Sequence, residues 1–327
     1  MYTKVTDQAI LVTGGAGFIG SNLCESFLKN GNRVVCLDNF ATGKRENVNE
    51  FTKDRNFTLI EGDICDYDTC VNALKGIDLV CHQAALGSVP RSIENPIRTN
   101  DVNVSGFLNM LTASKEKGIK RFVYAASSST YGDSTALPKL EDNIGNPLSP
   151  YGVTKLVNEL YARVFSQLYG LQVIGLRYFN VFGRRQDPLG AYAAAIPKFI
   201  KAFLDNESPI IYGDGTQSRD FTYIENVLQA NHLALSTNEP YAFNQVFNVA
   251  CGERIELKDL IQILKDKLAE IDASIGKVEI LYGEERKGDV KHSLASIEKA
   301  QKLLGYAPTH TYLQGIEESI NWYKENL

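Results

Sequence analysis

The chain has 327 residues, of which 44% are hydrophobic and 22% are charged. These proportions are close to the average of globular proteins, so they exclude a disordered chain and a fibrous repeat. The 34 basic and 39 acidic residues give a net charge of −5, which leaves no basic surface of the kind that binds nucleic acid. The longest apolar run, residues 191–196, is far shorter than the ~20 residues that span a bilayer.

The N-terminus, MYTKVTDQAI, has no basic region followed by an apolar one, so we expect no secretory signal. The six cysteines, at positions 24, 36, 65, 70, 81 and 251, form no CxxC pair. The four histidines stand apart from one another and from any pair of cysteines. We therefore expect a cytoplasmic protein with reduced cysteines, no bound metal, and neither a nucleic-acid nor a membrane partner.

Apolar runs alternate with amphipathic stretches over the first 180 residues. The runs predicted as strands are Ala9–Thr13, Arg33–Leu37, Phe57–Ile60, Asp78–Cys81, Arg121–Ala126 and Gln172–Leu176. The stretches predicted as helices are Asn22–Asn30, Thr69–Lys75, Val102–Lys117 and Thr154–Tyr169. A glycine stands just past each predicted helix, as helix ends favour. This alternation predicts an α/β fold with a doubly wound parallel sheet that helices cover on both faces.

The pattern is looser after Gly183, where prolines and glycines interrupt shorter elements. We predict helices at Ile224–Leu235, Leu257–Leu268, Ile297–Leu304 and Tyr312–Tyr323, and a strand at Val246–Val249. This indicates a large lobe of residues 1–183 with a return segment at 220–250, and a smaller C-terminal α/β lobe of residues 184–219 and 251–327.

A glycine-rich turn, ILVTGGAGFIGSNL, joins the first predicted strand to the first helix. Gly14 permits the tight turn, Gly17 lets the backbone approach a pyrophosphate, and Gly20 lets the helix pack closely on the strand. Asp38 ends the next strand, where a carboxylate binds the ribose hydroxyls of adenosine and repels a 2′-phosphate. The pattern predicts a Rossmann-type domain that binds NAD rather than NADP. Asp63 either contacts the adenine end of the cofactor or caps a turn.

Tyr151 and Lys155 lie four residues apart in SPYGVTK, so they share one face of a helix that begins near Pro150. A phenol has a pKa near ~10 and is a poor base at neutral pH, but a neighbouring ammonium favours its phenolate. The strand upstream ends in three serines, Ser127, Ser128 and Ser129, whose hydroxyls are available to hold a substrate oxygen. A YxxxK pair alone is weak evidence for a catalytic site. It becomes stronger evidence here because it follows a dinucleotide-binding turn.

Four segments, TGGAGFIG, AASSSTYG, SPYGVTK and GLRYFNVFGRRQDP, resemble the extended short-chain dehydrogenase/reductase superfamily and, more narrowly, its UDP-sugar 4-epimerases. The stretch HQAALGSVPRSIENP is similar to the branch that acts on UDP-N-acetylglucosamine and UDP-N-acetylgalactosamine. The resemblance runs from about residue 8 to the end. It implies NAD as a retained cofactor, a UDP-sugar as substrate, a homodimer, and a role in supplying polysaccharide precursors.

The resemblance also implies roles for individual residues. Tyr151 would take the proton of the sugar 4-hydroxyl, Lys155 would lower the pKa of Tyr151, and Ser127, or else Ser128, would hold the 4-oxygen. The implied cofactor contacts are Gly14, Gly17, Phe18, Ile19, Gly20, Asp38, Asn39, Asp63, Ile64, Gln83, Ala84, Tyr151 and Lys155. The implied substrate contacts are Ser88, Ser127, Ser128, Asn180, Arg219, Arg286, Asp289 and Ser293.

Ser293 stands where relatives restricted to UDP-glucose and UDP-galactose carry a tyrosine, so its small side chain leaves room for an N-acetyl group. The alternative is that Ser293 only caps a helix. Ala41 stands where a close relative would offer a hydroxyl, so one adenosine contact is expected to be missing.

Other functions stay open. A 4,6-dehydratase would need an Asp-Glu pair after Ser127, whereas Ser128 and Ser129 follow it. A UDP-uronate 4-epimerase is harder to exclude, because Arg91 has the charge to meet a carboxylate. A non-catalytic NAD-binding protein would commonly lose the tyrosine–lysine pair. The helices at 102–117 and 154–169 would pair across the dimer axis, unless Leu156, Leu160 and Val164 serve only the internal core.

Overall fold

A computed structural model describes residues 2–189, 194–285 and 291–326. At its centre lies a sheet of seven parallel strands, in the order β11-β6-β5-β4-β1-β2-β3. The strands are β1 (Ala9–Thr13), β2 (Arg33–Asp38), β3 (Phe57–Glu61), β4 (Leu79–His82), β5 (Arg121–Ser127), β6 (Gln172–Tyr178) and β11 (Gln245–Val249). Each predicted strand begins and ends within two residues of an observed one, and the predicted doubly wound α/β fold is confirmed.

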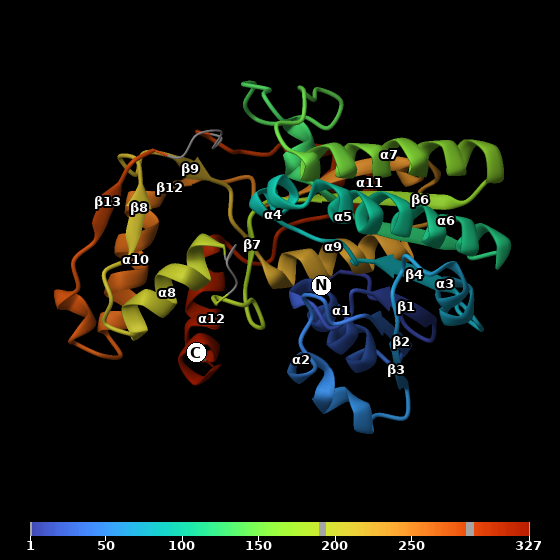
Figure 1. Ribbon diagram of the computed structural model, residues 1–327, viewed down its shortest axis with the longest axis horizontal. Coiled ribbons are helices and arrows are strands. Elements are labelled where there is room, and N and C mark those ends of the chain that lie inside the picture. Colours follow the sequence, from blue (N-terminus) through green and yellow to red (C-terminus); the bar gives the residue numbers. More distant parts are fainter. Residues whose placement is uncertain (1, 190–193, 286–290, 327) are drawn as a thin grey trace.

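Helices cover both faces of this sheet (Figure 1). One face carries α1 (Phe18–Lys29) and α9 (Ile224–Ser236), and the other carries α3 (Tyr67–Ala73), α6 (Phe107–Glu116) and α7 (Pro150–Tyr169). Along β1, Ile10 and Val12 face the first set of helices, whereas Leu11 faces the second. All three side chains are fully buried. A sheet buried on both faces explains why its strands appear in the sequence as unbroken apolar runs.

The segment between β4 and α6 differs from the prediction. Helical structure begins at Pro96 rather than Val102, and runs through α5 (Pro96–Asn100) and a π-helical stretch (Asp101–Gly106) into α6. A further short helix, α4 (Val89–Glu94), precedes it. The Asn95 side chain accepts a hydrogen bond from the Arg98 amide and caps α5. These pieces are short and partly polar, so they leave no clear helical period in the sequence.

The second lobe lies beside the sheet and contains three mutually packed helices, α8, α10 and α12 (Figure 1). Its elements are α8 (Ala195–Leu204), β8 (Ile210–Tyr212), β9 (Ser218–Arg219), β12 (Ile255–Glu256), α10 (Leu257–Ala269), β13 (Leu281–Gly283) and α12 (Tyr312–Asn326). Between the lobes, β7 (Val181–Phe182) pairs with β10 (Thr222–Tyr223). The return segment adds α9 and β11 to the sheet. α11 (Glu298–Leu304) packs against β11 and α9, although it belongs to the range predicted for the second lobe.

The remaining helices are short. They are α2 (Glu46–Asn49) and the 3₁₀ helices η1 (Glu50–Lys53), η3 (Ser128–Tyr131), η4 (Pro240–Ala242) and η5 (Ile275–Lys277). Among the described residues, no helix is long and apolar enough to cross a membrane. The strand order reverses between β1 and β4, and ligands of such sheets bind at the carboxyl ends of the strands at that point.

Candidate active site

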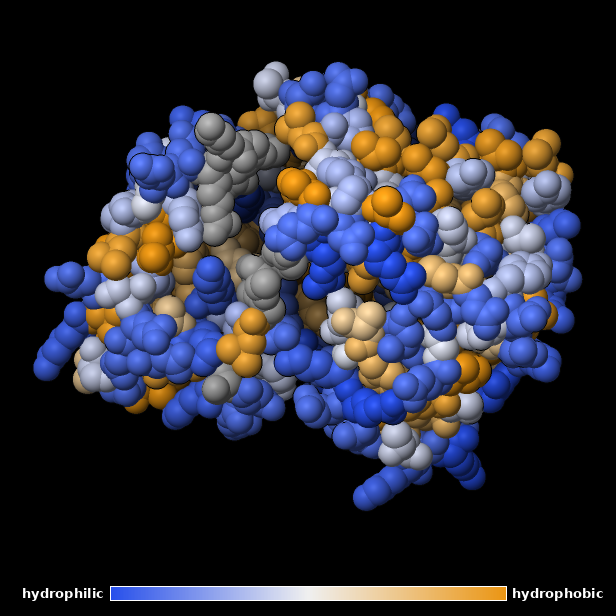
Figure 2. All heavy atoms as spheres, viewed as in Figure 1, coloured by the Kyte–Doolittle hydropathy of each residue, from blue (hydrophilic) through white to orange (hydrophobic). Residues whose placement is uncertain are grey.

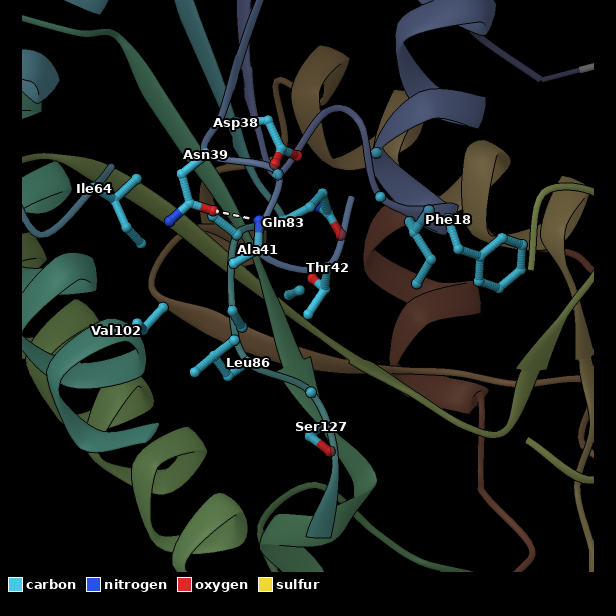
Figure 3. Close-up of a pocket in the computed structure, with 18 of the residues that line it drawn as sticks. Phe18, Asp38, Asn39, Ala41, Thr42, Ile64, Gln83, Leu86, Val102 and Ser127 are labelled. Carbon is cyan, nitrogen blue, oxygen red and sulfur yellow. Dashed lines mark hydrogen bonds between the residues drawn. The ribbon is translucent and has the colours of Figure 1, made fainter. Parts of the chain in front are cut away.

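A cleft of about 510 Å³ opens at this point, where β1, β2, β4 and β5 end. Figure 3 shows its wall, with Asp38 and Ser127 far apart in the view. The structure brings all the predicted cofactor contacts to this one cleft. They are Gly14, Gly17, Phe18, Ile19, Gly20, Asp38, Asn39, Asp63, Ile64, Gln83, Ala84, Tyr151 and Lys155. These residues come from five separate stretches of sequence and form one continuous wall.

The turn between β1 and α1 depends on its glycines. Gly14 has a φ of +65°, and a Cβ there would lie 2.7 Å from the Ala84 amide nitrogen. A Cβ on Gly20 would lie only 2.1 Å from the Gly14 carbonyl oxygen. Gly17 precedes α1 and offers no side chain to cap it, so the first amides of the helix remain available to a ligand. This arrangement fits the pyrophosphate of a dinucleotide.

Asp38 is 7% exposed and is held at the wall of the cleft by the backbone. Its Oδ2 accepts a hydrogen bond of 2.9 Å from the Ala16 amide, and its Oδ1 accepts one of 2.8 Å from the Phe40 amide. Burial raises the pKa of this carboxyl, although both amides lower it. A Cβ on Gly43 would lie 2.9 Å from each carboxylate oxygen, so this glycine lets the following loop close over Asp38.

The same loop offers a hydroxyl that the sequence analysis missed. Ala41 lines the cleft, as expected, and Thr42 lines it directly beside Ala41 (Figure 3). The hydroxyl expected to be missing at position 41 is therefore available one residue later. The Asn39 side-chain oxygen, Oδ1, accepts a 3.0 Å hydrogen bond from the Ala41 amide, which fixes the start of this loop.

Asp63 binds three neighbours. Its Oδ1 accepts a hydrogen bond of 2.8 Å from the Cys65 amide. Asp63 therefore caps a turn, which is one of the two roles that the sequence allowed for it. Its Oδ2 accepts bonds of 3.0 Å from Asn39 and from the Arg98 guanidinium. Burial raises the pKa of Asp63, but these hydrogen bonds outweigh it and lower the pKa overall. Arg98 was not predicted, because only the fold brings α5 to this edge of the cleft.

The predicted catalytic residues meet at the opposite end of the cleft. Tyr151 and Lys155 lie in the first turns of α7, which Ser149 caps by accepting a 3.1 Å hydrogen bond from the Gly152 amide. The Lys155 side chain is buried, donates to the Ala125 carbonyl at 2.8 Å, and lies 5.9 Å from the centre of the Tyr151 ring. Ser127, the last residue of β5, lines the cleft beside them.

The cleft wall includes Ser127 but not Ser128, which begins the helix η3. The Ser127 hydroxyl accepts a hydrogen bond of 3.1 Å from the Ser129 amide, which fixes its position at the end of the strand. Of the two serines left open by the sequence, the structure therefore favours Ser127 as the one that reaches a ligand.

Burial is the largest influence on the pKa values of Tyr151 and Lys155. Burial raises the pKa of Tyr151, although the Ser127 hydroxyl lowers it. Burial also lowers the pKa of Lys155 to about 8, although Glu159 raises it. The protein groups alone thus keep the Tyr151 phenol protonated at neutral pH. The lowering of its pKa by Lys155, which the resemblance implies, stays a prediction.

A second cavity of about 570 Å³ meets the first at Gly87 and Ser88, and both cavities are lined by Val181. Figure 2 shows the surface hollowed between the two lobes. Three predicted substrate contacts, Ser88, Asn180 and Arg219, line this second cavity. It therefore extends the cofactor cleft from the catalytic residues into the second lobe.

Each of these three side chains also has a partner in the protein. Ser88 accepts a 3.2 Å hydrogen bond from the Arg91 amide and caps α4. Asn180, in the turn before β7, donates to the Asp220 carbonyl at 2.8 Å. Arg219 donates to the carbonyl of Ser218 at 3.0 Å.

The other predicted substrate contacts are less well placed. Ser293 is half-buried, and its amide donates to the Ser218 carbonyl at 3.0 Å, but it lines neither cavity. Arg286 and Asp289 lie outside the described residues. The roles predicted for these three residues stay predictions.

Several lining residues were not predicted. Tyr178 lines the cleft, and its hydroxyl donates to Gln83 at 3.2 Å. Tyr178 ends β6, two residues before Asn180, and this position at the carboxyl end of a strand could have predicted that it lines the cleft. Leu86, Val102 and Gln186 line the cleft from loops or helices whose positions only the fold decides. Arg91, which the sequence offered only as a contact for a uronate, lines it as well. Within the described ranges, no three His, Cys, Asp or Glu side chains lie where they could hold a metal ion.

Comparisons with known proteins agree with this geometry. A model of the NAD dependent epimerase/dehydratase family matches residues 10–250. The chain is 38% identical to the structure of a UDP-N-acetylglucosamine 4-epimerase from Methanobrevibacter ruminantium M1 in complex with UDP-N-acetylmuramic acid, with a TM-score of 0.92 over 99% of this chain and 100% of that one.

Two other relatives carry different substrate names. A UDP-glucuronic acid 4-epimerase from Bacillus cereus, solved with UDP-glucuronic acid and NAD, is 34% identical, with a TM-score of 0.88 over 98% of this chain and 100% of that one. A putative UDP-glucose 4-epimerase of Methanocaldococcus jannaschii is 38% identical over 97% of this chain and 99% of its own length. The chain therefore belongs to the NAD dependent epimerase/dehydratase family and is an NAD-dependent nucleotide-sugar 4-epimerase.

Proposed function

We propose that the enzyme interconverts UDP-N-acetylglucosamine and UDP-N-acetylgalactosamine, and that it also accepts UDP-glucose and UDP-galactose. The observation that carries the choice of an N-acetylated sugar is the full-length similarity to a UDP-N-acetylglucosamine 4-epimerase. The family resemblance adds the small side chain of Ser293 as support, because a small residue at that position would not exclude an acetamido group; in the structure Ser293 lines neither cavity.

In the proposed mechanism the Tyr151 phenolate oxygen takes the proton of the sugar 4-hydroxyl, and loss of the hydride from C4 completes the oxidation of C4 to a ketone. The chemistry that NAD would supply in this cleft is reversible acceptance of the C4 hydride. The buried Lys155 ammonium favours the phenolate and binds the nicotinamide ribose, and the Ser127 hydroxyl donates to the 4-oxygen. After the 4-keto sugar turns about its phosphate link, return of the hydride to the opposite face of C4 would invert that carbon, while Tyr151 gives the proton back to the 4-oxygen.

The second cavity would hold the rest of the substrate. Arg219 has the charge and fork geometry that suit a diphosphate, and it lines this cavity with Asn180 and Ser88. Arg286 and Asp289 would complete the diphosphate and uridine contacts, as the family resemblance implies. This division puts the cofactor at the sheet and the substrate between the lobes, with the catalytic residues where the two cavities meet.

Incubation of the purified protein with UDP-N-acetylglucosamine, without added cofactor, tests the proposal. We expect the anomeric proton signals of UDP-N-acetylgalactosamine to appear by NMR until equilibrium, because each turnover regenerates NAD. The control is the same protein with UDP-glucose, which we expect to react more slowly. If a preparation shown to contain NAD left the acetylated sugar unchanged, the substrate assignment would be wrong.

A UDP-uronate 4-epimerase, acting on UDP-N-acetylglucosaminuronic or UDP-glucuronic acid, is the second candidate. Arg91 lines the cofactor cleft and carries a charge that suits a sugar carboxylate. The similarity to a UDP-glucuronic acid 4-epimerase also favours it. Competition between UDP-N-acetylglucosamine and UDP-glucuronic acid separates the candidates, since equal or faster turnover of the uronate would favour the second.

We propose a homodimer that forms through α7. Leu160, Val164 and Leu168 repeat every four residues along this helix and are 51%, 44% and 68% exposed. The alternative that Leu156, Leu160 and Val164 serve only the internal core is therefore wrong for Leu160 and Val164, whereas Leu156 is half-buried. Figure 2 shows hydrophobic surface over α6 and α7, and an apolar stripe of this kind favours association.

We expect light scattering to give twice the chain mass of 36.2 kDa, and Leu160→Glu to give the monomer, because a charge cannot be buried at the centre of such a stripe. The control is Tyr241→Glu, which changes a side chain that is 79% exposed on another part of the surface. A wild-type monomer, or a Leu160→Glu dimer, would refute this interface.

The cytoplasm is the proposed place of the reaction. All six cysteines are free thiols, as expected in a reducing compartment. Supply of precursors for polysaccharide synthesis would be consistent with that location, because nucleotide sugars are the donors for such synthesis.

A further inference from the structure

Asp220 is a fully buried carboxylate that the mechanism does not use. It lies between Arg219, which lines the second cavity, and β10. Its Oδ1 accepts a hydrogen bond of 3.0 Å from the Cys251 amide, and its Oδ2 accepts bonds of 3.1 Å from Gly252 and 3.3 Å from Ala295. A buried charge needs such partners, because an unpaired one is costly in the protein interior.

The amides that Asp220 binds belong to two different parts of the chain. Cys251 and Gly252 lie just beyond the end of β11, the edge strand of the central sheet, and Gly252 has a φ of +77°. Ala295 belongs to a segment that returns from the second lobe. The single carboxylate therefore ties an edge of the cofactor-binding sheet to the lobe that would hold the substrate.

The returning segment lies alongside residues 218–220. The Ser218 amide donates to the Lys291 carbonyl at 3.1 Å, and the Ser293 amide donates to the Ser218 carbonyl at 3.0 Å. The Arg219 guanidinium also donates to the Lys291 carbonyl, at 3.1 Å. The Ala295 bond to Asp220 is the last of this series, so it anchors the segment that carries Ser293.

The main chain of Asp220 positions a third predicted substrate contact. β7 pairs with β10, with Val181 opposite Thr222, and this places Asn180 beside Asp220. The Asn180 amide group donates to the Asp220 carbonyl at 2.8 Å. Asn180 has a φ of +36°, a conformation that a residue other than glycine keeps only where its surroundings hold it.

We propose that Asp220 is a positioning residue for nucleotide-sugar binding: it holds together the segments that carry Asn180, Arg219 and Ser293. This inference rests on the proposed substrate roles of those three residues. Asp220 itself lines neither cavity, so it acts through its neighbours. Loss of the carboxylate would weaken binding of the uridine diphosphate moiety and leave the cofactor cleft, whose glycine turn and Asp38 lie on other strands, largely intact.

The test is Asp220→Asn, which keeps the shape of the side chain. The carboxamide nitrogen would face an amide donor, so at least one hydrogen bond is lost. Burial raises the pKa of Asp220 to about 7, although its three amide partners lower it, so binding is measured at pH 8, where the carboxylate is ionised. With UDP as the probe in calorimetry, we expect the Kd to rise at least about tenfold, while NAD content per chain stays unchanged.

Asp214→Asn is the matched control. Asp214 precedes Asp220 in the chain, on the connection between β8 and β9. It is exposed, and its carboxylate accepts hydrogen bonds from the amide and the hydroxyl of Thr216 within its own turn. We expect its Kd for UDP to equal that of the wild type. Unchanged UDP affinity in Asp220→Asn, or a parallel loss of UDP and NAD binding, would overturn the proposal. Failure of the wild type itself to bind UDP would instead refute the proposed function.

A second measurement needs no variant. Coupling between a ligand and a structural contact is reciprocal, so UDP should strengthen the hydrogen bonds that Asp220 accepts. In hydrogen–deuterium exchange of the wild type, we expect UDP to slow exchange in peptides covering residues 250–253 and 291–296. Bound UDP that leaves both peptides unchanged would contradict the proposal even if Asp220→Asn failed to fold.

Discussion

Tyr151→Phe is expected to lower the rate of 4-epimerisation on the order of 10³-fold, while the protein keeps its NAD. The substitution removes only the phenol oxygen, and a positioned acid–base group contributes roughly 10²–10⁴-fold to such a step. Because Lys155 is held by the Ala125 carbonyl at 2.8 Å rather than by Tyr151, its position should not depend on the lost hydroxyl. The measurement is the initial rate with UDP-N-acetylglucosamine, together with the NAD released on denaturation.

Tyr169→Phe is the control for this prediction. It makes the same chemical change on the same helix, at a side chain that is 52% exposed and that contacts Phe165 through its ring. We expect wild-type turnover from it. A Tyr151→Phe enzyme with near wild-type activity would remove Tyr151 from the mechanism.

Gly20→Ala is expected to remove NAD binding and to destabilise the fold by about 1–3 kcal/mol, the usual cost of an atom forced into a packed site. The new Cβ would lie 2.1 Å from the Gly14 carbonyl oxygen and 2.8 Å from the Gly15 Cα, which are both backbone atoms. The glycine turn would have to move away from α1, and the helix amides offered to the pyrophosphate would move with it. Denaturant unfolding and NAD content measure the two effects.

Gly276→Ala is the matched control, since a Cβ there would meet only the Ala269 side chain at 3.7 Å, an ordinary contact distance. We expect this variant to keep its NAD and to unfold like the wild type. If Gly20→Ala retained NAD at the wild-type level, the turn would not depend on close packing at this position.

Features that arise from local chemistry could be predicted from the residues alone. The buried strands appear as apolar runs because both faces of the sheet are covered, and Gly14, Gly17 and Gly20 carry a spacing that one turn and one helix impose. Tyr151 and Lys155 fall on one helix face because of the helical period. The prediction that the helical segment leading into α6 begins at Val102 was wrong. It begins at Pro96, because a proline and a capping asparagine set its N-terminus and no apolar period marks it.

Which distant side chains meet depends on packing and could not be predicted from the sequence. Arg98 reaches Asp63, and Gly43 admits the loop over Asp38, because helix and loop packing brings together residues with no fixed spacing in the chain. The choice of Ser127 over Ser128 depends on where β5 ends. Likewise the raised pKa of Tyr151 and the lowered pKa of Lys155 come first from burial, and burial is a property of the packed molecule that no motif contains.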